Sequence, residues 1–192
     1  MPTARTIAGT VNEMAAAFAA AGLDTPRLDA RLLVAHALKM DPARVFMRGD
    51  EQIAVDQGAA LDAVTSRRLA HEPVGRIVGQ REFYGREFLL GPATLEPRPD
   101  SETLVDAALR HRRPNHAARI LDLGTGTGCL LLSILGEWPE ATGVGVDLAS
   151  QAVDVARINA ERLELAERAV FQTGDWCTGL AQVFDLIVGN PP

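Results

Sequence analysis

The chain has 192 residues, of which 25 are acidic and 19 are basic, so its formal net charge is −6. Hydrophobic residues make up 47% of the sequence, which excludes a disordered or collagen-like chain and allows a packed core. Phosphate neutralisation by Lys and Arg carries most of the affinity for nucleic acid, so an acidic chain disfavours direct nucleic-acid binding. No signal-peptide pattern opens the chain and no apolar run reaches the ~18 residues of a membrane span, so we expect a cytoplasmic protein without membrane contact.

The cysteine and histidine content of the chain argues against a metal site. Two cysteines cannot form a disulfide framework, and the four separated histidines offer no zinc-ligand spacing. We therefore predict that no metal is bound. Cys129 and Cys177 are each predicted to be small core residues rather than nucleophiles.

Residues 1–72 carry apolar side chains at helical spacing, which predicts a small helical domain. The first helix is expected to stop at Gly22, and Thr25 followed by Pro26 is typical of an N-cap and a first helical residue. A third helix follows Asp41, and a fourth runs over residues 56–69. The apolar positions of these helices are Ile7, Val11, Met14 and Phe18, then Leu28, Leu32, Ala35 and Leu38, then Val45 and Phe46, then Ala60, Leu61 and Val64.

Residues 73–99 have the composition of a β-hairpin followed by a proline-rich linker. Two short strands, over 81–84 and 87–90, surround a turn that contains Gly85. The segment 97–99 is expected to be extended, since each proline keeps the preceding residue out of the helical region. Asp100 or Ser101 then caps a helix that continues to Leu109.

Residues 100–192 alternate between strands and helices. Strands are predicted over 120–123, 144–146, 170–171 and 184–188, with a helix over 129–135 closed by Gly136 and another over 150–163. The inward side chains of the last helix are predicted to be Val153, Ala156 and Ile158. This alternation predicts an α/β domain with a Rossmann-like, doubly wound parallel sheet, in which the first and fourth strands are neighbours and ligands bind at the carboxyl ends.

A glycine-rich loop separates the first strand of this sheet from its helix. Asp122 lies in the strand directly before the loop, and the loop consists of Gly124, Thr125, Gly126, Thr127 and Gly128. The spacing is G-x-G-x-G rather than the G-x-G-x-x-G of dinucleotide-binding proteins. Asp122 would repel a pyrophosphate, whereas a ligand with an amino group and a sulfonium would tolerate that carboxylate. The loop is therefore predicted to bind a cationic cofactor rather than NAD.

Two further segments lie where the rest of a nucleoside would be held. Asp147 ends the second strand, 19 residues after Gly128, and can accept hydrogen bonds from both hydroxyls of a ribose. Its alternative role is a charge at a helix N-terminus, and both can hold at once. After the third strand, Asp175 and Trp176 offer an acceptor for an exocyclic amine and a ring that stacks on adenine, although a lone Trp is more often a core residue.

The chain ends with Asn190, Pro191 and Pro192 after the fourth strand. Two prolines remove two backbone donors and leave only acceptors. The side-chain oxygen of Asn190 and the carbonyl of Pro191 can each accept one N–H of a planar amino group, which aims its nitrogen at an electrophilic methyl group. A rigid turn at the end of the strand is the alternative interpretation.

These motifs resemble S-adenosylmethionine-dependent methyltransferases of the Asn-Pro-Pro-Tyr class. The stretches over 72–79 and 97–102, with Glu82, Phe83, Leu104 and Val105, make the chain similar to the peptide chain release factor N5-glutamine methyltransferases, the PrmC or HemK family. The similarity is weak over the helical bundle and strong from Glu72 onward. Glu96 stands where the family usually has an apolar residue.

The resemblance implies methyl transfer from S-adenosylmethionine to the glutamine of the Gly-Gly-Gln motif in class-1 release factors. It implies cofactor contacts from Asn190, Asp147, Trp176 and the loop 124–128, and substrate binding and catalysis by Asn190, Pro191 and Pro192. It also implies a helical release-factor-binding candidate over 1–72, a hairpin and linker over 73–99, and a methyltransferase domain over 100–192. The chain stops before the expected tyrosine and the last strands, so we expect a fragment that self-associates and is inactive alone.

Three other functions remain open from the sequence. An adenine-N6 DNA methyltransferase shares the Asn-Pro-Pro motif and meets the same geometric problem, but the acidic charge disfavours it. A ribosomal-protein glutamine methyltransferase would differ only in its N-terminal region. A non-catalytic cofactor-binding module is the alternative from another class of protein.

Overall fold

The computed structural model describes residues 5–111 and 117–190. Two compact units divide the chain between Val78 and Gly79. The first unit is helical, with one isolated β-bridge between Thr6 and Gln52. The second unit contains all the β-strands of the described residues. No helix in these described ranges has the length and apolarity needed to cross a membrane.

The first unit is a bundle of short helices around one apolar core. Its elements are α1 (Ile7–Ala20), α2 (Pro26–Ala37), α3 (Pro42–Met47), the 3₁₀ turn η1 (Val55–Gln57), α4 (Gly58–Leu69) and α5 (Val74–Val78). The core contains Ile7, Met14, Phe18, Leu33, Val34, Val45, Leu61 and Val64, all buried. The sequence therefore predicted the helices and most of their inward positions, but it missed α5.

Three details of the helical prediction are wrong. Leu28 is 46% exposed, because the buried face of α2 is centred on Ala30 and Leu33, and Ala60 of α4 is exposed beside the buried Leu61. Thr25 precedes α2 but its side chain does not cap the helix. Its hydroxyl donates instead to Oδ1 of Asp29 at 2.7 Å.

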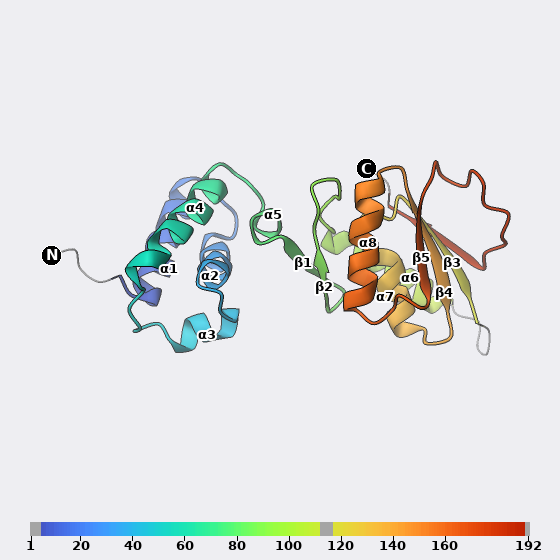
Figure 1. The fold of residues 1–192 in the computed structure, drawn as a ribbon. Coiled ribbons are helices and arrows are strands. Elements are labelled where there is room, and N and C mark those ends of the chain that lie inside the picture. The colour runs from blue at the N-terminus through green and yellow to red at the C-terminus, as the bar shows by residue number, and fades with distance from the viewer. Residues whose placement is uncertain (1–4, 112–116, 191–192) are drawn as a thin grey trace. The chain divides into compact units, whose positions relative to one another are not determined.

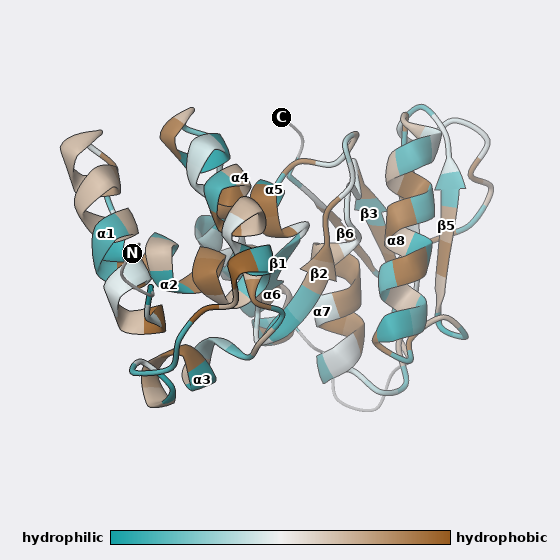
Figure 2. Cartoon of the chain, turned by 60° about the vertical axis from the view of Figure 1, so that its left-hand side comes forward, coloured by the Kyte–Doolittle hydropathy of each residue, from teal (hydrophilic) through white to brown (hydrophobic). Residues whose placement is uncertain are grey.

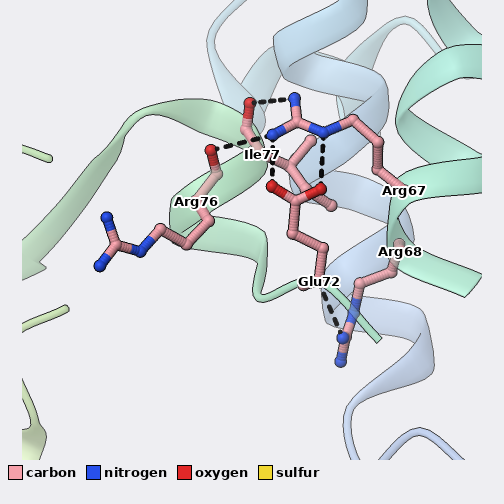
Figure 3. A network of polar contacts seen from close by, with 5 residues as sticks. All are labelled: Arg67, Arg68, Glu72, Arg76 and Ile77. Carbon is pink, nitrogen blue, oxygen red and sulfur yellow. Dashed lines mark hydrogen bonds and ion pairs between the residues drawn. The ribbon is translucent and has the colours of Figure 1, made fainter. Parts of the chain in front are cut away.

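A polar network joins the end of α4 to α5 (Figure 3). The guanidinium of Arg67 donates to both carboxylate oxygens of Glu72, at 2.5 and 2.7 Å, and to the carbonyls of Arg76 and Ile77 at 3.3 Å. Arg68 donates to the Glu72 carbonyl at 3.1 Å. A positive charge is favourable at the carbonyl end of a helix. The stretch that begins at Glu72 therefore serves to anchor α5.

The second unit begins with an antiparallel hairpin of β1 (Gln80–Phe83) and β2 (Arg86–Leu89). Tyr84 and Gly85 form the turn, and both have positive φ, 51° and 70°. Two successive positive φ angles define the turn that best matches the twist of a two-residue hairpin. Phe83 and Phe88 pack edge to face with ring centroids 6.2 Å apart. The hairpin prediction is confirmed.

The remainder of this unit is a parallel four-stranded sheet with the strand order β5-β4-β3-β6. Its strands are β3 (Arg119–Leu123), β4 (Thr142–Asp147), β5 (Ala169–Thr173) and β6 (Leu186–Gly189). Ile120 is in register with Gly143 on one side and Leu186 on the other. The Rossmann-like sheet, with its first and fourth strands adjacent, is confirmed.

Helices α6 (Glu102–Arg110), α7 (Cys129–Glu137) and α8 (Ser150–Arg162) lie on one side of the sheet (Figure 1). The 3₁₀ turn η2 (Pro99–Ser101) leads directly into α6. Hydrophobic and hydrophilic residues alternate around α8, as expected for a helix with one buried face (Figure 2). The core between helices and sheet contains Val105, Leu131, Ile134, Val153 and Phe171.

Several expectations for this unit are wrong. Ile158 is 46% exposed, and Cys177 is exposed rather than part of the core. Gly136 lies inside α7 instead of closing it. The guanidinium of Arg86 lies close to Gly136, and a Cβ atom on Gly136 would meet it. A larger residue at this place would have to displace that guanidinium, and the backbone of Gly136 itself is helical.

Candidate functional site

The glycine-rich loop connects β3 to α7 at the carboxyl edge of the sheet. Gly124, Gly126 and Gly128 all have positive φ, at 71°, 54° and 80°. The amides of Gly124 and Thr125 both donate to the carbonyl of Val146, at 2.9 and 3.0 Å. Positive φ is costly for other residues, so these glycines allow the chain to fold back on β4.

Asp122 lies beneath this loop and is 1% exposed. Its Oδ2 accepts a hydrogen bond of 2.6 Å from the hydroxyl of Thr125. Burial raises the pKa of Asp122 to about 6, although the Thr125 hydrogen bond acts in the opposite direction. The carboxylate therefore fixes the loop from below and places negative charge behind it.

Asp147, the last residue of β4, holds two backbone segments at once. Its Oδ2 accepts from the amide of Gly126 at 2.8 Å, and its Oδ1 accepts from the amide of Ala149 at 2.9 Å. Ala149 immediately precedes α8. Both interpretations of Asp147 therefore have a geometric basis, since a carboxylate with two bonds keeps further acceptor positions for a ligand.

A pocket of about 450 Å³ opens above the loop, a volume within the usual range for small-molecule sites. Gly124, Thr125, Gly126, Thr127, Asp147, Trp176 and Asn190 all line it. Gly128 does not, since its Cα faces Leu132 and Phe171, which a Cβ atom there would meet at 3.1 Å. Pro191 and Pro192 lie outside the described residues.

The far end of the pocket is lined by the segment that follows β5. Asp175 and Trp176 both face the pocket, and Trp176 is 56% exposed with a φ of 51°. An indole that packs in no core is available to stack on a planar ligand. The pocket thus combines carboxylates, hydroxyls and an aromatic ring, and these side chains fit the ribose, the amino group and the base of a nucleoside cofactor.

One further part of the pocket lining was not predicted from the sequence. It is formed by residues 93–101, from which Leu95, Glu96, Arg98 and Ser101 line the pocket. Glu96 pairs with Arg81 at 3.3 Å, which accounts for a charged residue at this position. The hydroxyl of Ser101 does not cap α6, contrary to the sequence-based expectation. It accepts a hydrogen bond of 2.7 Å from the side-chain amide of Asn190.

Asn159 is a second residue that sequence reasoning missed. It is fully buried in α8, where its Oδ1 accepts from the amide of Leu89 at 2.8 Å. Its Nδ2 donates to the carbonyl of Thr127 at 2.9 Å and to that of Leu89 at 3.1 Å. The only sequence signal is an Asn between the inward positions Ala156 and Ala160. Asn159 thus joins the hairpin to the glycine-rich loop.

The parallel sheet, the glycine loop and the acidic residue that ends the second strand define a methyltransferase domain of Rossmann-like architecture. In agreement, residues 100–192 match the methyltransferase small domain family. Residues 10–79 match the PrmC N-terminal domain family.

Three curated relatives of this chain share one name. The chain is 49% identical over 172 residues to the release factor glutamine methyltransferase of Rhodospirillum rubrum, an alignment that covers 90% of this chain and 53% of the relative. It is 40% identical to the proteins of that name in Bradyrhizobium diazoefficiens, covering 99% and 65%, and in Escherichia coli, covering 88% and 61%. The chain is similar to these release factor glutamine methyltransferases and spans between about half and two thirds of their length.

Proposed function

We propose that the protein transfers the methyl group of S-adenosylmethionine to the side-chain amide nitrogen of the glutamine in the Gly-Gly-Gln motif of class-1 release factors. The observation that carries this proposal is the position of Asn190. It follows β6 and lines the same pocket as the glycine loop and Asp147. A cofactor and an amide acceptor can therefore meet in one cavity.

The residues of the pocket divide into two groups with different tasks. Asp147 would accept hydrogen bonds from ribose hydroxyls, while Trp176 would stack on the adenine and Asp175 would accept its amine. The loop 124–128, with Asp122 behind it, would surround the amino acid portion with backbone and negative charge. When bound, S-adenosylmethionine supplies an electrophilic methyl group carried by a sulfonium.

Asn190 performs the second task, which is to hold the acceptor. An amide nitrogen is a poor nucleophile because its lone pair is delocalised, so positioning and electrostatics must supply the catalysis. The Oδ1 of Asn190 would accept one N–H of the substrate amide, and the carbonyl of Pro191 would accept the other. Both contacts would stabilise the positive charge that develops on the amide nitrogen as it forms the new bond.

The proposed partners follow from the substrate. The helical region over 1–72 is the proposed contact surface for the release factor, and the methyltransferase region over 100–192 is the proposed site of chemistry. We propose no direct contact with nucleic acid or membrane, and a cytoplasmic location, where release factors act. The names of the relatives and the net charge of −6 support this assignment.

Transfer of a labelled methyl group tests the proposal. The whole protein is incubated with methyl-labelled S-adenosylmethionine in three separate reactions. One contains a class-1 release factor, one contains ribosomal proteins and one contains adenine-containing DNA. We expect label only in the release factor, and none when its Gly-Gly-Gln glutamine is replaced by alanine. Label in DNA or in a ribosomal protein, or in no acceptor, would contradict the proposed substrate.

A further inference from the structure

Ser101 and Asn190 are 89 residues apart in sequence, yet their side chains form a direct hydrogen bond. Asn190 Nδ2 donates to Ser101 Oγ over 2.7 Å. Ser101 is 7% exposed, at the junction of η2 and α6, while Asn190 directly follows β6. The contact therefore ties the residue that would hold the substrate to a buried hydroxyl that lines the same pocket.

The backbone explains why this hydroxyl is available. A serine that caps a helix normally has an extended backbone, and its oxygen accepts from an amide in the first turn. Ser101 has helical angles, φ −70° and ψ −14°, because the 3₁₀ turn continues into α6 without a break. Its own amide donates to the carbonyl of Arg98 at 2.9 Å. The side chain is thereby excluded from capping and directed toward Asn190.

The contact also determines which end of the Asn190 carboxamide faces the substrate. A carboxamide has a donor end, Nδ2, and an acceptor end, Oδ1. With Nδ2 held by Ser101, Oδ1 points away from the hydroxyl. In the reversed orientation two NH₂ groups, one from Asn190 and one from the substrate amide, would oppose each other as donors.

We propose that Ser101 is a positioning residue that fixes the side chain of Asn190 with its oxygen toward the acceptor amide. This inference rests on the proposed function, because it concerns how Asn190 would hold a substrate amide. Ser101 contacts Asn190 and acts through it. Loss of its hydroxyl allows the carboxamide to rotate, which lowers the fraction of enzyme that holds the amide correctly without removing any cofactor contact.

Kinetics of three variants of the whole protein test this role. Ser101→Ala is expected to lower kcat by about 10- to 100-fold, the range typical of a misplaced reactive group, while the Kd for S-adenosylhomocysteine stays within about threefold. Ser101→Thr keeps a hydroxyl on the same carbon and should restore most of the activity. Thr103→Ala is the matched control, since Thr103 is exposed in the same helix and donates only to the carbonyl of Asp100.

A measurement on Asn190 itself separates this inference from the proposed function. In ¹⁵N-labelled protein, the side-chain amide signals of Asn190 are identified by their loss in Asn190→Asp. We expect one Nδ2 proton to move upfield in Ser101→Ala and to keep its position in Ser101→Thr and Thr103→Ala. An unchanged signal in Ser101→Ala would refute the contact, whatever substrate the protein uses.

The remaining outcomes are also decisive. If the wild-type protein methylates a release factor and Ser101→Ala keeps kcat within threefold, the positioning role is wrong although the proposed function stands. If the wild-type protein methylates no release factor, the proposed function fails and the positioning role fails with it, even where the hydrogen bond is observed.

Discussion

The carboxylate of Asp147 accepts a hydrogen bond from the backbone amide of Gly126, with 2.8 Å between Oδ2 and the nitrogen. This bond joins the end of β4 to the middle of the loop that follows β3. The residue proposed to bind the ribose therefore also shapes the loop beside it before any ligand arrives. Cofactor affinity and loop geometry should change together when this side chain is altered.

We expect Asp147→Ala to weaken S-adenosylmethionine binding to the whole protein by roughly 1–3 kcal/mol, about 5- to 150-fold in Kd, because charged acceptor bonds are lost. Asp147→Asn retains one acceptor oxygen and should give a smaller loss. Calorimetric titration measures both, with Asp154→Ala as an exposed control on α8. An unchanged Kd in Asp147→Ala would contradict the ribose role.

The buried carboxyl of Asp122 should make stability depend on pH. Its pKa is raised from 3.8 to about 6 by burial, so between about pH 4 and 6 the folded chain binds more protons than the unfolded chain. The free energy of unfolding therefore falls as pH rises through this window, by about 3 kcal/mol in total, and the loss is complete above about pH 6.

The variant Asp122→Asn removes this titration. We therefore compare the free energy of unfolding of the variant with that of wild type at two pH values. The difference, variant minus wild type, should be about 1–3 kcal/mol larger at pH 7 than at pH 4. Urea unfolding followed by tryptophan fluorescence is a suitable measurement, since both tryptophans, Trp138 and Trp176, lie in the second unit. Asp56→Asn, an exposed change in the first unit, serves as the control. A difference that does not vary with pH would show that Asp122 is ionised normally.

Replacement of Asn159 should destabilise the second unit. Asn159→Ala leaves the amide and carbonyl of Leu89 and the carbonyl of Thr127 without their partner in a buried place. We expect a loss of about 2–4 kcal/mol, since each unsatisfied buried group costs about 1–3 kcal/mol and part of the cost is relieved by water. The same urea experiment measures it, and Glu161→Ala on the exposed face of α8 should have almost no effect. A loss below about 1 kcal/mol would disprove the structural role.

The two cysteines should differ sharply in reactivity. Burial raises the pKa of the Cys129 thiol to about 12, although Cys129 lines the pocket. The thiolate is the reactive form, so a rise of about three pKa units leaves about a thousandfold less of it at pH 8. Peptide mapping after limited iodoacetamide treatment should find label on the exposed Cys177 and almost none on Cys129. Equal labelling would contradict the raised thiol pKa of Cys129.

Much of the fold was predictable from local patterns. The glycine loop between an apolar strand and an apolar helix identifies the segment 119–137 by itself, and the rules of parallel sheets then place β3 beside β6. The hairpin turn at Gly85 is equally local. These features depend on residues that are close in sequence, where spacing and backbone preference are informative.

The contacts that complete the site are of another kind. Asn159 bonds to Leu89, 70 residues away, and Asn190 bonds to Ser101, 89 residues away. Serine before a helix ordinarily predicts a cap, and only the continuous 3₁₀ turn prevents it. Gly136 ordinarily predicts a helix end, yet it lies inside α7 with the guanidinium of Arg86 from the hairpin packed against it. No single-sequence pattern contains these long-range partners.

The order of strands in the sheet also bears on how the protein emerges from the ribosome. The helical unit, whose core lies between Ile7 and Ile77, can assemble while the rest is still being synthesised. Strand β3 has no such advantage, because the amide of Arg119 bonds to Asp185, 66 residues later. One side of strand β3 must therefore wait, with its hydrogen-bonding groups unpaired, until β6 has been synthesised. If the segment between β3 and β6 is synthesised slowly, the unpaired edge of β3 would need protection by a chaperone. Rapid synthesis would shorten the time for which this edge is exposed.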